Sequence, residues 1–246
     1  FGNFNFRMKA SDGVKTQTAT TAVELKSFPP LGITGWYDAD PAFATDSAGT
    51  LVFTDQSGLG NPDAYGPNYS SSLGSIFGEP AYGTGGNSAR YVLFQGDYGS
   101  GTGGQIGTTI FISTSTDTSI RGYAQTLTTS DFFMFVGYTS TPPFNIYSGP
   151  ANPKLRINKV ECATPTSAQG GADFVTNFSL SKMNSLAYTG FMPTSSIDLM
   201  HPTKTSNRPS DFWVRAALFF NKTLTNAEID AVHDHYAAIY GTDMAS

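Results

Sequence analysis

The feature that most constrains the fold of this chain is a series of short apolar and aromatic stretches separated by turn-forming residues. Gly, Pro, Asn and Ser gather between the stretches, for example at residues 58–62, 83–87 and 99–104. Many short strands with Gly-rich turns between them are typical of β-sandwiches and jelly rolls. The stretches that we predict as strands cover residues 33–38, 50–54, 89–94, 108–113, 131–138, 154–160, 174–180 and 212–220.

The polar residues of the chain are mostly uncharged. Only 13% of the 246 residues are charged, whereas about 55 are Ser or Thr. Thr, Tyr and Phe favour strands, and a coiled coil or helical bundle would be richer in Ala, Glu, Lys and Leu. Aromatic residues make up 13% of the chain and the net charge is only −5, which argues against a disordered chain. Composition therefore supports an all-β fold.

Charge and hydropathy also limit the partners. The 14 Lys and Arg residues are outnumbered by 19 Asp and Glu residues and form no basic run, so we expect no binding to nucleic acid. The longest apolar stretches, at residues 132–136 and 216–220, are far shorter than the roughly 18 residues that a membrane crossing needs, so we expect no membrane insertion. Cys162 is the single cysteine, which excludes an internal disulfide.

The first residues of the chain predict a β-hairpin, residues 1–28. Phe4, Phe6 and Met8 alternate with polar residues, a turn signal follows at residues 11–13, and a Thr-rich strand returns. The prolines of residues 29–31 predict a short stiff linker. We therefore place a domain boundary there and assign residues 32–246 to one domain.

One helix is predicted near the end of the sequence. Thr225 and Glu228 have the spacing of a capping box, apolar residues follow at helical spacing, and Gly241 provides a stop signal. We expect this helix to cover an open face or end of the sandwich.

Two segments resemble parts of a known family. The sequence TGWYDADPAFATDSAGTLVFTDQSGLGN at residues 34–61 resembles the opening of laminin-G-like, concanavalin-A-like jelly-roll domains. The sequence ALFFNKTLTNAEIDAVHDHYAAIYG at residues 217–241 resembles their closing strand and helix. The resemblance implies a two-sheet antiparallel jelly-roll sandwich with one C-terminal α-helix. Such domains are common in bacteriophage fibres, other virion surface proteins and secreted bacterial adhesins, where they mainly bind, often to glycans.

A second resemblance concerns the predicted hairpin. The sequence FNFRMKASDGVKTQTATTAVEL at residues 4–25 resembles the closing hairpin of bacterial immunoglobulin-like or cadherin-like repeats. It implies that a module begins upstream of Phe1. The alternative, which we weigh equally, is an arm that pairs with a neighbouring subunit.

The jelly-roll fold also carries glycoside hydrolases, whose carboxylates lie two residues apart on one face of a strand. Glu228, Asp230 and His233 give a partial match to their motif. That match falls on the predicted helix, where positions two apart face different directions, and the same geometry separates His233 from His235. No Ser-His-Asp or Cys-His arrangement is suggested either, so we expect no enzymatic activity and a structural role for Cys162.

Sugar binding would use aromatic rings in polar loops, and the candidates are Tyr65, Tyr69, Tyr82, Tyr98 and Tyr147. We expect no cofactor. Calcium is a minority alternative at Asp38, Asp40 and Asp55, because oxygen-rich loops at the rim of a sandwich suit this cation. For Asp55 we favour a turn in which the carboxylate bonds its own backbone.

These patterns and resemblances together predict a non-enzymatic virion surface protein. It would be a fibre or capsid decoration outside the cell that attaches to host-surface glycans or stabilises the shell. Its partners would be other virion subunits or copies of itself, and host glycans. The alternative is a secreted bacterial adhesin or carbohydrate-binding module. A second alternative, a polysaccharide-degrading glycoside hydrolase, needs two carboxylates about 5 Å or 6.5–9.5 Å apart in a groove.

Overall fold

The computed structural model describes residues 4–11, 16–23, 28–47, 50–66, 74–83, 92–94, 106–115, 123–126, 132–135, 154–162, 173, 176–192, 197–199 and 212–246. Within these residues the chain is mostly antiparallel β-sheet, and its longest helix, α2 (Asn226–Tyr240), comes after the last strand. The predicted all-β class with a C-terminal helix is thereby confirmed.

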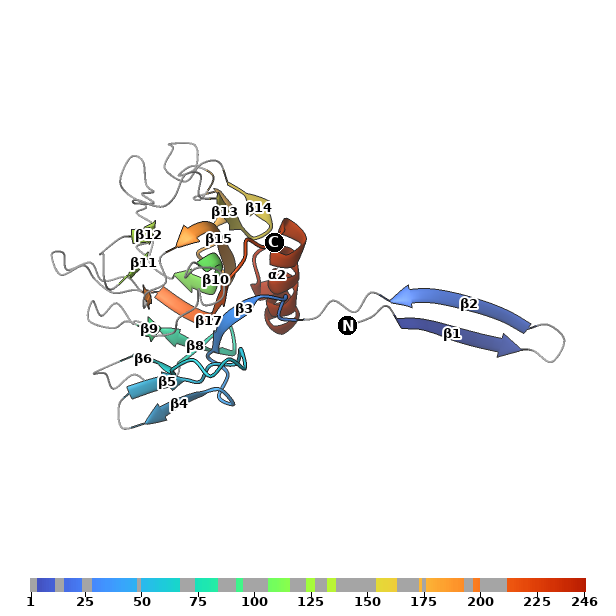
Figure 1. Cartoon of the computed structure of the whole chain (residues 1–246), viewed down its shortest axis with the longest axis horizontal. Helices are drawn as coiled ribbons and strands as arrows, with labels where there is room; N and C mark the ends of the chain where they lie inside the picture. Colours follow the sequence, from blue (N-terminus) through green and yellow to red (C-terminus); the bar gives the residue numbers. More distant parts are fainter. Residues whose placement is uncertain are drawn as a thin grey trace.

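Two large sheets make up the body of the molecule (Figure 1). The eight-stranded sheet has the order β14 (Val160–Glu161), β13 (Lys154–Ile157), β15 (Asn184–Met192), β10 (Ile106–Ser115), β17 (Phe212–Phe220), β8 (Glu79–Gly83) and β7 (Gly74–Ile76), and β3 (Ile33–Asp38) also pairs with β17. The seven-stranded sheet has the order β12 (Phe132–Phe135), β11 (Tyr123–Thr126), β16 (Ile197–Leu199), β9 (Val92–Phe94), β6 (Ala64–Gly66), β5 (Thr50–Phe53) and β4 (Ala44–Ser47).

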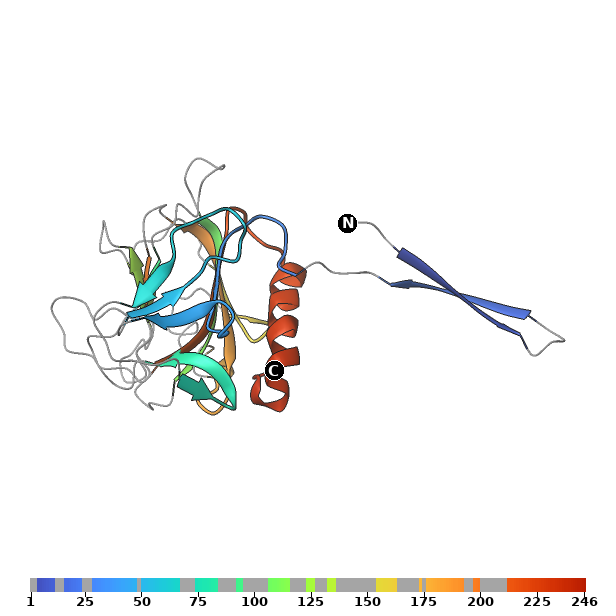
Figure 2. The same ribbon diagram turned by 90° about the horizontal axis from the view of Figure 1, so that it is seen from below.

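A first hydrophobic core joins the two sheets. Ala44, Phe53 and Ala64 of the seven-stranded sheet are buried in one cluster with residues of the eight-stranded sheet, among them Phe111 and Phe219. A second core joins the other face of the eight-stranded sheet to α2. Figure 2 shows α2 lying alongside this sheet, so that the body has three layers.

Strand β17 supplies both cores, which explains why residues 216–220 are apolar without interruption. Ala217 and Phe219 belong to the core between the sheets, whereas Leu218 and Phe220 pack beneath α2. Successive side chains of a strand point to opposite faces, so a strand that is buried on both faces has a nearly continuous apolar sequence. Each of these fully buried Leu or Phe side chains stabilises the fold by about 2 kcal/mol.

Helix α2 begins and ends where the sequence predicts. The Thr225 hydroxyl accepts a hydrogen bond from the Glu228 amide (3.3 Å), and the Glu228 carboxylate accepts one from the Thr225 amide (2.8 Å). This is a complete capping box. Gly241 follows the last helical residue with a φ of 56°, which a side chain would disfavour.

Two of the strand predictions are wrong. Residues 154–160 do not form one strand but turn back as the β13–β14 hairpin, because Asn158 and Lys159 adopt φ values of 47° and 70°. Thr176 and Asn177, inside the predicted strand 174–180, are helical. The strand of this region is β15, which the sequence analysis did not predict.

The predicted N-terminal hairpin is present as β1 (Phe4–Ser11) and β2 (Thr16–Val23). These strands pair with each other and form a separate two-stranded sheet. In both views the hairpin extends away from the body on the side of α2 (Figures 1 and 2). Among the described residues, no helix has the length and apolar character that a membrane crossing requires.

Candidate functional site

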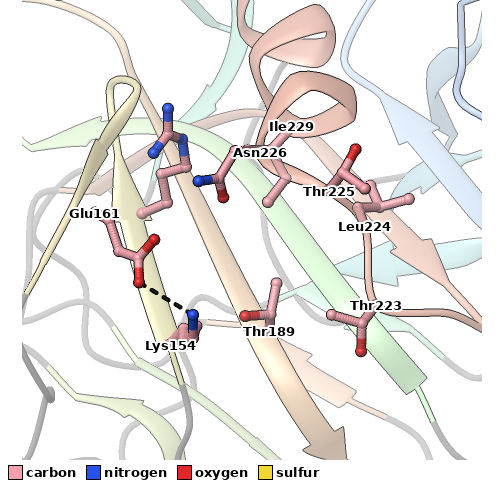
Figure 3. A pocket seen from close by; sticks show the side chains of 9 residues that line it. Lys154, Glu161, Thr189, Thr223, Leu224, Thr225, Asn226 and Ile229 are labelled. Atoms are coloured by element: carbon pink, nitrogen blue, oxygen red, sulfur yellow. Dashed lines mark ion pairs between the residues drawn. The ribbon is translucent and has the colours of Figure 1, made fainter.

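A cavity of about 160 Å³ opens between the β13–β14 hairpin and the start of α2. Figure 3 shows side chains of both elements converging on it. An apolar cavity of about 150 Å³ holds one six-membered ring, so this volume suits a ligand of that size. The described residues that line it are Lys154, Arg156, Glu161, Thr189, Thr223, Leu224, Thr225, Asn226 and Ile229.

The hairpin that forms one wall is fixed by Asn158 at its turn. Asn tolerates a positive φ better than most residues, and two such residues in succession give the tight turn that matches strand twist. The Asn158 side chain is buried and donates to the Asn177 carbonyl (2.7 Å) and to the Asn184 side-chain oxygen (2.8 Å). It also accepts a hydrogen bond from the Ser185 amide (2.9 Å). These contacts hold the hairpin against β15.

The charges at the cavity are paired. The Lys154 ammonium lies 3.2 Å from the Glu161 carboxylate, and this hydrogen bond lowers the pKa of Glu161, which is therefore ionised at neutral pH. The Arg156 guanidinium binds both oxygens of Asp230, at 2.9 and 3.0 Å. Two cations thus face two carboxylates, and the site has no excess charge to attract an ionic ligand.

The remaining lining residues combine an apolar surface with hydroxyl and amide groups. Leu224 and Ile229 are each only 4% exposed and form an apolar part of the wall. Thr189 and Asn226 lie close to them and provide donors and acceptors. A neutral ring with several hydroxyl groups has the matching chemistry, because each hydroxyl both donates and accepts.

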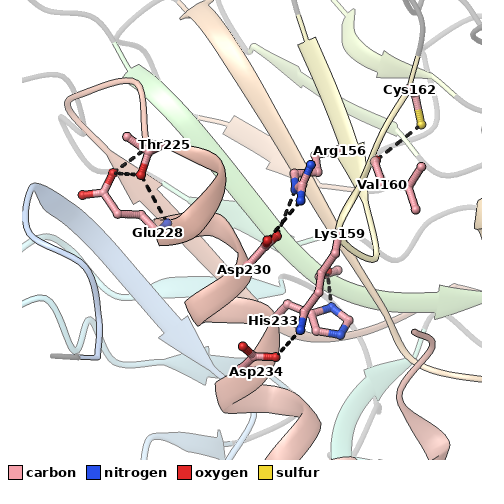
Figure 4. A network of polar contacts seen from close by, with 10 residues as sticks. Arg156, Lys159, Val160, Cys162, Thr225, Glu228, Asp230, His233 and Asp234 are labelled. Carbon is pink, nitrogen blue, oxygen red and sulfur yellow. Dashed lines mark hydrogen bonds and ion pairs between the residues drawn. The ribbon is translucent and has the colours of Figure 1, made fainter. Parts of the chain in front are cut away.

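Helix α2 is attached to the hairpin by a row of polar contacts (Figure 4). Beyond the Arg156–Asp230 pair, Lys159 forms an ion pair with Asp234. His233 lies one helical turn after Asp230. It is buried, and its Nδ1 lies 2.8 Å from the Ser185 hydroxyl. Burial lowers the pKa of His233, and the Lys159 charge lowers it further. The ring is therefore neutral at pH 7.

The calcium candidates Asp38 and Asp40 come together, but around Arg215. Asp38 is buried, and its carboxylate lies 2.7 Å from Arg215 Nε and accepts a hydrogen bond from the Tyr236 hydroxyl (2.8 Å). Asp40 lies 3.3 Å from Arg215 Nη2 and accepts a hydrogen bond from the Ala42 amide. Burial raises the pKa of Asp38 by more than the Arg215 charge lowers it. A guanidinium and hydrogen-bond donors, in place of the calcium we considered, hold both carboxylates.

Asp55 forms the turn that we favoured over a calcium ligand. One carboxylate oxygen accepts from the Ser57 amide (2.9 Å) and the Trp36 amide (3.0 Å). The other accepts from the Ser57 hydroxyl (2.6 Å) and from the backbone and side chain of Asn61. The described residues contain no group of three or more His, Cys, Asp or Glu side chains arranged to hold a metal ion.

The tyrosine predictions have different outcomes. Tyr82 is wrong as a ligand-binding residue, because it lies on β8 with no exposed surface, inside the core between the sheets. Tyr65 lies on β6. Tyr69, Tyr98 and Tyr147 lie outside the described residues.

The partial hydrolase motif has a structural role, as the predicted helix implied. Glu228 caps α2, Asp230 binds Arg156, and His233 faces Ser185. Cys162 is buried, and burial followed by the nearby charge of Asp173 raises its pKa to about 11, so its thiol is protonated and unreactive.

Sequence reasoning missed the residues of the cavity. They come from three segments far apart in the chain, and treating residues 154–160 as one strand concealed the turn that brings Glu161 back toward Lys154. One usable signal was present: Arg156 and Glu161 have opposite charges and flank an Asn-containing pair, and the structure pairs them across the hairpin.

Comparison with known proteins adds no relative. Protein-family models, curated proteins and solved structures were each searched, and none matches this chain. The resemblance to laminin-G-like domains therefore stays a prediction from the motifs at residues 34–61 and 217–241.

Proposed function

We propose that the chain is a non-enzymatic virion surface protein, a fibre or capsid decoration, whose jelly-roll domain attaches to host-surface glycans. The observation that carries the glycan part is the charge-balanced cavity between the β13–β14 hairpin and α2, with its hydroxyl, amide and apolar lining. The virion part comes from the resemblance to laminin-G-like, concanavalin-A-like domains. The two segments that bear this resemblance contain β3 and the second half of β17, which pair side by side, and this adjacency supports treating them as one motif.

A binding role is favoured over hydrolysis by the carboxylates of the site. Glu161 is the single carboxylate among the described lining residues, and it is paired with Lys154. Hydrolysis by the usual glycosidase mechanism needs two carboxylates on either side of the scissile bond. Asp230 of α2, which does not line the cavity, accepts hydrogen bonds from two nitrogens of Arg156.

The size of the cavity sets the expected strength of binding. It is smaller than the roughly 300–1,000 Å³ of typical small-molecule sites, so it accommodates one sugar ring of a longer glycan. We expect weak binding by a single copy, on the order of millimolar. Several copies on one particle would then raise the overall affinity by about 10²- to 10⁴-fold without any new contact.

The experiment is a titration of the whole chain with a panel of mono- and oligosaccharides, followed by saturation-transfer NMR. Lys154→Met should weaken binding about fivefold, which corresponds to the loss of one hydrogen bond of about 1 kcal/mol. Lys159→Met is the matched control, because this exposed lysine lies on the same hairpin but does not line the cavity.

Two results would count against the proposal. One is the absence of binding to every saccharide in the panel. The other is an equal loss of binding in both lysine variants, since that would place the binding surface away from the cavity.

A further inference from the structure

The register of the β1–β2 hairpin gives it two faces of different chemical character. Phe4 pairs with Val23, Phe6 with Thr21 and Met8 with Ala19. Since alternate positions of a strand share a face, these positions and the Ala10–Gln17 pair form one face, which is apolar except at Thr21 and Gln17. The opposite face carries the positions of Asn5, Arg7, Lys9, Ser11, Thr16, Thr18, Thr20 and Ala22. A two-stranded ribbon of this kind is marginally stable alone in water, so its apolar face needs a cover.

The described part of the body does not supply that cover. The hairpin is a separate sheet, and both views place it away from the body (Figures 1 and 2). The large apolar side chains that the described body exposes come from four different segments and have exposed fractions of 36% to 70%: Leu31, Phe43, Leu59 and Val160. Single apolar residues of this kind are common on protein surfaces and form no docking patch.

We propose that the apolar face of this hairpin packs against the same face of the hairpin in a second copy of the chain. The face is self-complementary, as a two-fold interface requires. Arg7 and Lys9 have register positions on the opposite face, so two hairpins meet without burying a charge. The pair is a small two-layered sheet that links two bodies.

The size of the contact predicts its strength. The four phenylalanine rings of two hairpins can bury about 600–1,000 Å². With Met8 and Val23 the total comes near 1,200 Å², the lower limit of specific interfaces. We therefore expect reversible association, with half of the chains paired at roughly tens of micromolar.

The test is sedimentation velocity on the 246-residue chain from about 1 to about 200 µM, a range that brackets this affinity. The average mass should rise from that of one chain, 26.2 kDa, toward twice that value. Phe6→Asp and Met8→Asp should abolish the rise. Asn5→Asp and Thr20→Asp introduce the same residue on the opposite face and should leave the association within about twofold of the original, because an exposed charge there costs little.

This pattern separates a lost interface from an unfolded hairpin. An aspartate that merely unfolded the ribbon would act alike on both faces, and that result would overturn the proposal. So would an original chain that stays at 26.2 kDa throughout, or association that persists in Phe6→Asp. The inference adds to the proposed function without depending on it, because saccharide binding is measured separately and its loss would leave the mass change intact.

Discussion

Arg215 places a positive charge in the interior, where only correct pairing keeps it from destabilising the fold. Its guanidinium lies between Asp38, whose side chain is 6% exposed, and Asp40, whose side chain is 43% exposed. It also donates to the Pro80 carbonyl (3.1 Å). Because Tyr236 of α2 donates to the same Asp38 carboxylate, this group connects the strands β3 and β17 with the helix.

The two aspartates offer a matched prediction. Asp38→Asn should lower the free energy of unfolding by about 3 kcal/mol, since it leaves the buried Arg215 charge with only the half-exposed Asp40 carboxylate as its ionic partner. Asp40→Asn, which changes the same atoms beside the same guanidinium, should cost less than about 1 kcal/mol, because solvent screens the exposed pair. Urea denaturation of both variants measures the difference. Equal losses would show that burial does not govern the contribution of these pairs.

For single residues, contacts between neighbours in the sequence could be predicted, whereas contacts between residues far apart in the chain could not. The turn at Asp55 follows from spacing, since Ser57 and Asn61 lie two and six residues away. The partner of Asp38 could not be predicted, because Arg215 is brought to it only by the pairing of β3 with β17. Tyr82 failed as a surface residue for the same reason: its neighbours in sequence are polar, but its neighbours in space are the core.

Helix α2 and the β13–β14 hairpin act as one unit in the structure. Three polar contacts join the sheet to the helix: Arg156 with Asp230, Lys159 with Asp234, and Ser185 with His233. The buried member, His233, is the one whose protonation would disturb the contact, because a charged imidazole would lie beside Lys159 in a poorly hydrated position.

The pH dependence of stability follows from that burial. The pKa of His233 is lowered in the folded chain, so the unfolded chain takes up the proton first as the pH falls through the ordinary value of 6.5. Stability should therefore be highest above that pH and fall between about pH 7 and 5. His233→Gln keeps a hydrogen-bonding side chain that does not titrate, and the fall in Tm from pH 7.5 to 5.5 should be smaller in this variant.

Part of the fall in Tm should remain in His233→Gln, because burial also lowers the pKa of His235. The His235 ring stacks on Phe28 with a distance of 3.5 Å between the ring centres. An unchanged fall in His233→Gln would mean that the imidazole is not the group that titrates.

Elements with strong local signals were predictable. The capping box at Thr225 and the stop at Gly241 depend on backbone groups within one helical turn, and both are present. The turn at Asn158 and Lys159 lacks glycine, the usual signal of a tight hairpin, and its conformation is stabilised by contacts with Asn184 and Ser185 from another strand. The sequence around residue 158 contains the opposite charges of Arg156 and Glu161 as a signal of the turn, but nothing that predicts the contacts with Asn184 and Ser185.

At the scale of the whole molecule, the body and the hairpin differ in how they are stabilised. Strands β10 and β17 are buried on both faces, between the second sheet and α2. The hairpin pairs its two strands along their whole length and forms a sheet separate from those of the body.

Hydrogen exchange should report this difference. At low concentration, where hairpins are unpaired, the amides of β10 and β17 should exchange at least about 100-fold more slowly than those of β1 and β2, because only the former require opening of a packed core. Mass spectrometry of peptides from each region provides the measurement. Equal protection would mean that the hairpin is covered within a single chain.

The position of β17 in the chain has a consequence for biosynthesis. This strand contributes to both hydrophobic cores, yet it follows every other described strand in sequence, and α2 follows it directly. During translation, the earlier strands therefore leave the ribosome before the strand that joins them exists. Neither core can close until residues 212–240 have emerged, so we expect the body to fold late, in one step, and nascent chains that stall earlier to expose β10 and β15 to chaperones.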